Sequence, residues 1–492
     1  MKRCCAALTK QLWGLLALVY AAAAAPASSA PVELGVCGTD SLAADSASAR
    51  CGFIDVPENP DDATGRHIRL RITVIPALKI TPEPDALMIL AGGPGQSAHD
   101  FYTSAGPAFA GIRRDRDIVL LDQRGTGSSH PLECASDPTE LEGSDPQQMQ
   151  TLARHCIASL DADTRFYTTS IAVRDLDIVR ESLGYRQLSL YGVSYGTRVA
   201  QHYMRRYPTR VRAAILDGVV PIDLALGPDV APRAQQALDA MFQRCADDSS
   251  CNAAFPGLRE QFSALHTRLG QTPIHARLPD PVTAQMQETA FGVQQLNAAV
   301  RLLTYSDESV SLLPLLIHEA QSTGQPEPFI AQYLMVRRMT DTQFAYGMHF
   351  AVVCSEDAPR WAEQDVADAA LEQTYLGASF MQGMRSVCNV WPHGVVDDDF
   401  NAPLHNDTPV LILSGGNDPV TPPAYGERAL TSFPHGRHLV LKGQGHGQLA
   451  VGCMPRLLTQ FVNTASASTL DTKCLEAVAP TPFMLSPAGP GP

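Results

Sequence analysis

LSLYGVSYGTRVA, residues 188–200, begins with strand-forming residues and continues as a helix after a glycine-flanked serine. Within it, Gly192, Ser194 and Gly196 match the pattern Gly-x-Ser-x-Gly, in which the serine occupies a sharp strand-to-helix turn. Such a turn lifts the Ser194 hydroxyl clear of the sheet and places backbone N–H groups at a helix start, where negative charge is stabilised. Ordinary strand–helix turns also carry this pattern, so a catalytic serine requires that the chain also supply a base, an acid and an oxyanion site.

Strand and helix patterns alternate on both sides of the serine turn. Short apolar or alternating runs typical of strands occupy residues 52–56, 67–76, 86–90, 117–122, 187–191, 211–217, 409–413 and 437–442. Helical spacing of apolar residues covers residues 170–183, 195–207, 422–433 and 453–463. Strands that alternate with helices predict an α/β fold, in which a mostly parallel, eight-stranded sheet has helices on both faces.

The strand–helix alternation is lost between residues 222 and 400. There the segments 230–245, 256–270, 293–320 and 361–385 have the apolar spacing of amphipathic helices. We therefore expect an all-helical cap inserted over the carboxyl ends of the strands, where open α/β sheets bind ligands. The predicted organisation is a signal peptide (1–27), a core in two parts (28–221 and 401–475), the cap (222–400) and a loosely ordered Pro-rich tail (476–492).

The N-terminus has the layout of a secretory signal peptide. Lys2, Arg3 and Lys10 precede the apolar segment 11–25, which is too short for a confident membrane span. Ala27 ends an Ala-x-Ala triplet and is the expected cleavage point. The alternative is an uncleaved anchor. We expect a secreted or periplasmic protein that has no membrane segment after cleavage.

Cysteine content and charge agree with export. Of the 12 cysteines, Cys4 and Cys5 lie in the signal segment, and an even number remains, which suggests disulfides. Pairing sequence neighbours gives 37–51, 134–156, 245–251, 354–388 and 453–474, although sequence alone does not fix the connectivity. No Cys-x-x-Cys and no histidine pair at helical ligand spacing indicates a metal site. The net charge of −14 argues against nucleic acid or anionic membrane as the main partner.

A base and an acid follow two of the C-terminal strands. A serine hydroxyl needs a base to accept its proton, and the base needs an acid to orient it. His446 lies in a glycine-rich loop after strand 437–442, and Asp418 follows strand 409–413. The chain order nucleophile, acid, base is the one used in α/β sheets of this kind, so we predict a triad of Ser194, Asp418 and His446. The non-catalytic interpretations are an Asx turn at Asp418 and a surface histidine at position 446. Asp217 is the second candidate for the acid.

Two backbone N–H groups are needed to hold an oxyanion. The residue after the nucleophile, Tyr195, supplies one, and the loop after the third strand supplies the other. In the run Gly92-Gly93-Pro94-Gly95, Pro94 has no N–H. We predict Gly93 as the second donor, with Gly92 as the alternative.

Five motifs in order resemble one enzyme family. LAGGPGQS (90–97), LDQRGTGSS (121–129), LYGVSYG (190–196), LSGGNDPVTP (413–422) and GQGHGQ (443–448) are similar to the α/β-hydrolase fold peptidases of the prolyl aminopeptidase family. More narrowly, they resemble its secreted tripeptidyl aminopeptidase branch with a TAP-like C-terminal segment. Prolyl aminopeptidases usually have histidine where this chain has Ala91, a departure that fits the secreted branch and weakens a strict proline specificity.

The resemblance implies cleavage of peptides from a free N-terminus through an acyl-enzyme, without a metal or organic cofactor. The substrate ammonium group then needs a carboxylate in the cap. Cys354-Ser355-Glu356 resembles the family's Cys-x-Glu segment, so Glu356 is the expected amine-binding residue and Asp357 the alternative. The competing functions are a secreted carboxylesterase or lactonase with the same triad, because fold does not settle substrate, and a non-catalytic binding protein.

Overall fold

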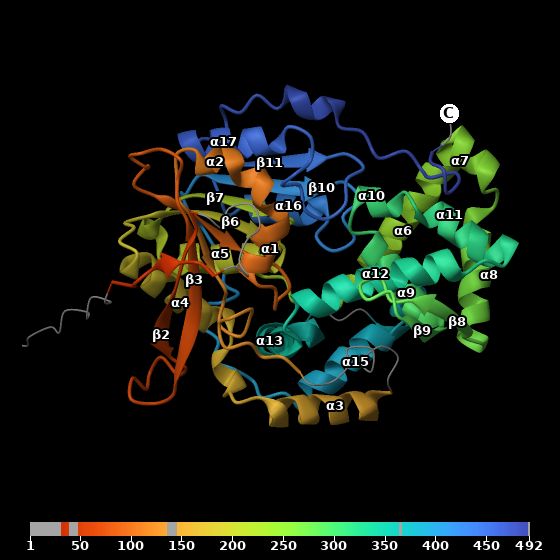
Figure 1. The fold of residues 1–492 in the computed structure, drawn as a ribbon, viewed down its shortest axis with the longest axis horizontal. Helices are drawn as coiled ribbons and strands as arrows, with labels where there is room; N and C mark the ends of the chain where they lie inside the picture. The colour runs from red at the N-terminus through yellow and green to blue at the C-terminus, as the bar shows by residue number, and fades with distance from the viewer. Residues whose placement is uncertain (1–30, 39–47, 135–144, 364–366, 491–492) are drawn as a thin grey trace, which may run out of the picture.

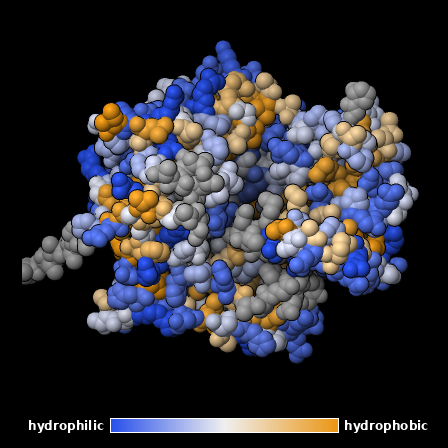
Figure 2. Space-filling view, viewed as in Figure 1, coloured by the Kyte–Doolittle hydropathy of each residue, from blue (hydrophilic) through white to orange (hydrophobic). Residues whose placement is uncertain are grey.

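The computed structural model describes residues 31–38, 48–134, 145–363 and 367–490 of the chain. Strands and helices form a core on one side of the molecule, and a mainly helical cap lies beside it (Figure 1). In Figure 2 the surface is hollowed near its centre, between the core and the cap. The predicted signal peptide, residues 1–27, lies outside the described residues.

The described strands of the core form one nine-stranded sheet in the order β1-β2-β3-β5-β4-β6-β7-β10-β11. Their bounds are β1 Gly35–Val36, β2 Arg50–Pro57, β3 His67–Ile75, β4 Ala86–Leu90, β5 Ile118–Leu121, β6 Leu188–Val193, β7 Val211–Asp217, β10 Val410–Gly415 and β11 Gly436–Leu441. The pairs from β5 to β11 are parallel, and β1, β2 and β3 add an antiparallel edge. The α/β class and all eight predicted strands are confirmed; the two-residue β1 is an addition.

Helices cover both faces of the sheet because successive strand residues point to opposite sides. In β4, Leu87 and Ile89 pack in the cluster that contains α1, α2 and α17, whereas Met88 and Leu90 pack in the cluster that contains α4 and α5. The helices and helical turns of the core are α1 Ala98–Ala105, η1 Gly106–Phe109, α2 Ala110–Arg113, η3 Thr164–Phe166, α4 Thr169–Ser182, α5 Tyr195–Arg206, η4 Pro208–Arg210, α16 Pro423–Leu430, α17 Met454–Thr464 and η8 Lys473–Ala477. The helix α3 Pro146–Ser159 lies instead against the cap helix α15 Ser379–Cys388 (Figure 1).

The cap is not all-helical, so that prediction is wrong in part. It contains α6 Val230–Asp247, α7 Ser249–Ala254, α8 Leu258–Gln271, α9 Val293–Leu303, α10 Asp307–Val310, α11 Leu313–His318, η5 Glu319–Thr323, α12 Glu327–Gln343, α13 Tyr346–Val352, η6 Val353–Asp357, η7 Ala358–Glu363, α14 Asp368–Leu371 and α15 Ser379–Cys388. An antiparallel hairpin, β8 Ile274–Pro279 and β9 Met286–Phe291, interrupts these helices. Exposed and partly buried side chains alternate along both strands of the hairpin. Successive strand residues point to opposite faces, so one face packs on the cap and the other faces solvent.

Two predicted cap helices are also shorter than expected. The segment 293–320 breaks after α9, where the Ser306 side chain accepts the N–H of Ser309 and caps a new short helix. The segment 361–385 contains the end of η7, then α14, then the start of α15. In both places a local turn replaces a continuous helix.

Five disulfides join the described cysteines, and the predicted pairing of sequence neighbours is confirmed. The pairs are Cys37–Cys51, Cys134–Cys156, Cys245–Cys251, Cys354–Cys388 and Cys453–Cys474. Within the part of the chain that the structure describes, no helix combines the length and the apolar character that crossing a bilayer demands.

The Pro-rich tail packs against the cap, which contradicts the loosely ordered segment expected from its composition. The chain leaves the core after Cys474 and crosses to the cap (Figure 1). There the guanidinium carbon of Arg244 lies 3.9 Å from the centre of the Phe483 ring. The N–H of Met484 donates to the carbonyl of Ser311 at 3.1 Å. The tail therefore links the two parts of the molecule.

Candidate active site

Ser194 occupies the predicted turn between β6 and α5. Its backbone has φ 54° and ψ −124°, a conformation that is strained for a residue with a side chain and recurs at functional sites. The flanking glycines permit this turn, because a Cβ on Gly196 would lie 2.1 Å from the carbonyl oxygen of Leu90. The Ser194 N–H donates to the carbonyl of Asp217 at 2.9 Å, which fixes the turn to the neighbouring strand β7.

His446 and Asp418 are in direct contact at the carboxyl ends of β11 and β10. His446 Nδ1 donates to Asp418 Oδ2 at 2.8 Å. The other carboxylate oxygen accepts the N–H groups of Val420 and Thr421, each at 2.8 Å, so Asp418 forms an Asx turn as well as the contact with the histidine. The Thr421 hydroxyl donates to Asp418 Oδ2 at 2.8 Å and lies 3.1 Å from His446 Nδ1.

The contact between the two side chains lowers the pKa of Asp418 and raises the pKa of His446. Burial alone would raise the pKa of Asp418, but the charge and hydrogen bond of His446, with two backbone N–H groups, hold that pKa below its usual value. Burial alone would lower the pKa of His446, but the charge and hydrogen bond of Asp418 raise it. The arrangement favours an imidazole that can accept a proton and remain stable as an imidazolium.

Ser194 and His446 are held against the same short segment of backbone, Asp217–Gly218. Asp217 accepts the N–H of Ser194, and a Cβ on the next residue, Gly218, would lie 2.9 Å from Cε1 of His446. No hydrogen bond joins Ser194 Oγ to His446 among the described residues. Catalytic hydrogen bonds are often long without substrate and tighten in the reactive complex, so the placement is compatible with a nucleophile and its base.

The structure separates the two candidate acids. The carboxylate of Asp217 does not contact His446 Nδ1; it accepts the N–H of Gln448 at 2.8 and 2.9 Å and the hydroxyl of Tyr191 at 2.9 Å. Burial raises its pKa to about 6, although these donors and the charge of His446 act in the opposite direction. Asp418 alone of the two is placed to orient the imidazole.

The candidate oxyanion donors come from the loop after β4 and from the start of α5. Tyr195 is the first residue of α5, so its N–H has no partner within the helix. Gly92 donates its N–H to Oε1 of Gln96 at 3.2 Å, whereas the N–H of Gly93 has no acceptor among the described residues. Gly93 has φ 108°, and a Cβ there would lie 2.6 Å from the N atom of Gly95. The geometry favours Gly93 over Gly92 as the second donor.

Glu356 and Asp357 are buried at the boundary between the cap and the core. Thr169 donates to Glu356 from its N–H at 2.6 Å and from its hydroxyl at 3.0 Å. Arg198 of α5 lies 2.9 Å from Asp357 Oδ1 and 3.7 Å from Glu356 Oε2. Burial, together with the nearby charge of Asp357 but against that of Arg198, raises the pKa of Glu356 to about 8. The side chain of Glu356 is 0% exposed, so it does not open directly onto the surface.

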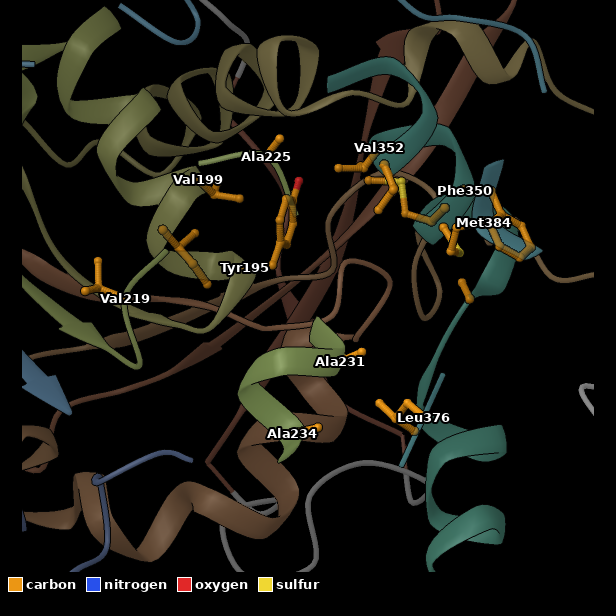
Figure 3. Packing of buried hydrophobic residues seen from close by; sticks show 14 of the residues in the cluster. Tyr195, Val199, Val219, Ala225, Ala231, Ala234, Phe350, Val352, Leu376 and Met384 are labelled. Atoms are coloured by element: carbon orange, nitrogen blue, oxygen red, sulfur yellow. The ribbon is translucent and has the colours of Figure 1, made fainter. Parts of the chain in front are cut away.

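Tyr195 connects this acidic pair with the nucleophile turn. Its hydroxyl is 2.6 Å from the Thr169 hydroxyl, which in turn contacts Glu356. Figure 3 shows the Tyr195 ring in the apolar cluster that also holds Ala231 of α6 and Val352 of α13. The Tyr195 hydroxyl is thus bonded within the core, to Thr169 and to Gln123, while its ring packs in a cluster that includes cap residues.

The cap also contacts the loop that carries His446 and the Gly92–Gln96 loop that carries the candidate oxyanion donor, which the sequence did not predict. The carbonyl of Tyr305 accepts the N–H of His446 at 2.6 Å, and the two rings meet edge to face at 5.4 Å. On the oxyanion loop, the N–H of Ala345 donates to the carbonyl of Gly95 at 3.0 Å, and Phe344 pairs with Gln96. Thr421 was also missed, although it stands within the quoted motif LSGGNDPVTP; no local signal marks Tyr305.

Comparisons with known proteins agree with this geometry. The sequence profile described as the alpha/beta hydrolase fold matches residues 85–452. The chain is 28% identical over 471 residues to serine protease Hip1 of Mycobacterium tuberculosis (strain ATCC 25618 / H37Rv), with 87% of each chain covered. It is 32% identical over 189 residues to the tripeptidyl aminopeptidase of Streptomyces coelicolor, with 35% of each chain covered. It is also 28% identical over 419 residues to carboxylesterase B of Mycobacterium tuberculosis (strain CDC 1551 / Oshkosh), with 76% of each chain covered.

Proposed function

Because the chain belongs to the alpha/beta hydrolase family, we propose that it is a serine hydrolase with Ser194 as nucleophile, His446 as base and Asp418 as orienting acid. The observation that carries this proposal is the 2.8 Å contact between His446 and Asp418 beside a serine at φ 54°. These three residues follow the ends of three strands in the parallel part of one sheet. Their placement at one edge of the sheet supports this assignment, and the proposal requires that a hydrogen bond from Ser194 to His446 form in the reactive complex.

The proposed reaction proceeds through an acyl-enzyme. His446 takes the proton of Ser194 as the hydroxyl oxygen attacks the substrate carbonyl. The N–H groups of Gly93 and Tyr195 hold the resulting oxyanion. His446 then protonates the leaving group, and water hydrolyses the acyl-enzyme while Asp418 keeps the imidazole oriented.

The proposed substrate class is peptides with a free N-terminus, from which the enzyme releases single residues or short peptides. Two relatives named as peptidases support this class. Glu356 and Asp357 face one guanidinium, that of Arg198, so full ionisation leaves one negative charge in excess. A substrate ammonium group would neutralise that charge and replace the proton that Glu356 holds. Contact requires Glu356 to turn away from Thr169, because its side chain has no exposed surface.

The proposed location is outside the cytoplasm, either the periplasm or the medium. Five disulfides support it, since such bonds persist in oxidising compartments.

Two measurements on the purified enzyme test the proposal. A fluorophosphonate probe should label the wild type and leave Ser194→Ala unlabelled; equal labelling of both would contradict the nucleophile assignment.

The second measurement tests the substrate class. A tripeptide p-nitroanilide with a free amine should be cleaved, and its N-acetylated form should resist cleavage. Glu356→Gln should reduce this preference, whereas Glu363→Gln, at an exposed acid on the neighbouring turn, should preserve it. The relative named carboxylesterase B makes an esterase the second candidate; equal cleavage of both peptides, with faster cleavage of simple esters, would favour it.

A further inference from the structure

Asp217 lies between the nucleophile turn and the loop that carries the base. Its backbone carbonyl accepts the N–H of Ser194 at 2.9 Å. Its carboxylate accepts the N–H of Gln448, two residues after His446, at 2.8 and 2.9 Å. Strand β7, which ends at Asp217, is paired on both sides, with β6 and with β10. One residue of a central strand thus holds both partners of the proposed proton transfer.

We propose that Asp217 is a positioning residue that sets the separation of Ser194 and His446, and that its negative charge supports the imidazolium formed during the reaction. This inference rests on the proposed serine hydrolase function. Replacement of the carboxylate by an amide would leave the N–H of Gln448 one neutral acceptor oxygen in place of two charged ones, and the loop could then move relative to Ser194. A displacement of about 1 Å at a reacting group can reduce the rate about 100-fold.

The surroundings of Asp217 support a role for its charge. The residue is 0% exposed, and no arginine or lysine forms an ion pair with it within the described ranges. An unpaired buried carboxylate is costly to the fold, and an amide could also fill the space. The groups that face Asp217 are the Tyr191 hydroxyl, the N–H groups of Gln448 and Leu449, and the imidazole of His446. The charged groups that face His446 are Asp418 and Asp217, which raise its pKa, and Arg301, which lowers it.

Two variants and one control test whether Asp217 positions His446 or contributes only to the stability of the fold. Asp217→Asn should reduce kcat for p-nitrophenyl acetate about 10- to 100-fold with little change in KM, and should lower the pKa of His446 measured by NMR of the imidazole, assigned with His446→Gln. Tyr191→Phe removes a donor that lowers the pKa of Asp217, so Asp217 carries less negative charge beside His446. The His446 pKa should therefore fall, and the acid limb of the kcat profile should move to lower pH. Asp85→Asn, at a buried acid before β4 that bonds to Arg116, should lower Tm but leave kcat and the His446 titration unchanged.

The outcomes also separate this inference from the proposed function. An unchanged kcat and an unchanged His446 titration in Asp217→Asn would overturn the inference. If that variant does not fold, an unmoved acid limb and His446 titration in Tyr191→Phe would overturn it. Failure of the fluorophosphonate to label the wild type would instead reject the serine hydrolase, while the His446 titration, which needs no turnover, would still decide whether Asp217 acts on the imidazole.

Discussion

The carboxyl group of Glu356 is buried beside a second acid, Asp357, and one guanidinium, that of Arg198. In the folded protein its pKa is about 8, against 4.5 for an unperturbed glutamate. The folded state therefore binds a proton that the unfolded chain has released between these two pH values. Stability falls as pH rises through a window in which the native state binds more protons.

We expect Glu356→Gln to remove this dependence of stability on pH. The Tm of the wild type should fall as pH rises from about 5 to about 8. The Tm of the variant should fall less over the same range, because glutamine does not ionise. Thermal unfolding followed by circular dichroism at several pH values measures the difference. The control Glu363→Gln, whose side chain is 67% exposed in the wild type, should follow the wild-type curve. Parallel curves for Glu356→Gln and the wild type would contradict the assigned burial and pairing of this acid.

At the scale of elements, the cap forms part of the support for the loops that carry the proposed base and the proposed oxyanion donor. The loop that carries His446 is bonded on the cap side to the carbonyl of Tyr305, and the oxyanion loop is bonded to Ala345. Gly445 makes the first contact possible, because a Cβ at this position would lie 2.3 Å from the Tyr305 oxygen. The close approach depends on the absence of a side chain.

Gly445→Ala should therefore push the loop and the cap apart. We expect kcat to fall about 10-fold or more, through displacement of the imidazole. Gly270→Ala in cap helix α8 is the matched control, because a Cβ there meets nothing within 4 Å. Steady-state kinetics of the two variants decide the point, and full activity of Gly445→Ala would show that the cap contact is dispensable.

The sequence predicts those elements whose signals are local. Each predicted core strand combines strand-forming residues with nearby turn residues, and Asp418 and His446 follow two of these strands directly, so the sheet edge brings them together. The hairpin β8–β9 escapes prediction because charged and polar residues such as Arg277 and Glu288 weaken its apolar alternation. The contact between Tyr305 and His446 escapes it for another reason: a backbone carbonyl leaves no trace in the side-chain pattern, and the cap must pack before the two groups meet.

At the scale of the whole molecule, disulfides connect elements that shape the site. Cys354 lies in the turn η6 that also carries Glu356, and Cys388 ends helix α15. The bond closes a loop with a sequence separation of 34, compared with 6 for Cys245–Cys251 at the α6–α7 junction. In the chain-entropy account a longer loop gives a larger stabilisation, about 4 kcal/mol against about 2 kcal/mol here.

Replacing both members of each pair by alanine tests this connection. The double variant at Cys354 and Cys388 should have a lower Tm than the wild type. It should also show a weaker preference for the free peptide over the N-acetylated one, because the disulfide no longer holds the turn that carries Glu356. The double variant at Cys245 and Cys251 should lose Tm with little change in selectivity. Calorimetry and the pair of free and N-acetylated peptides provide the two readouts; equal effects of both replacements on selectivity would contradict a specific role of the first bridge.

The bond between Tyr305 and the His446 backbone has a pharmacological consequence. A compound that binds between the Gly445 loop and Tyr305 of the cap would break the hydrogen bond from the His446 N–H to the Tyr305 carbonyl. It would do so without reacting with the Ser194 hydroxyl. Such an inhibitor would be reversible, and it would leave the three side chains of the proposed triad chemically intact. Because it would recognise the cap, it could distinguish this enzyme from hydrolases that share the triad but have a different lid.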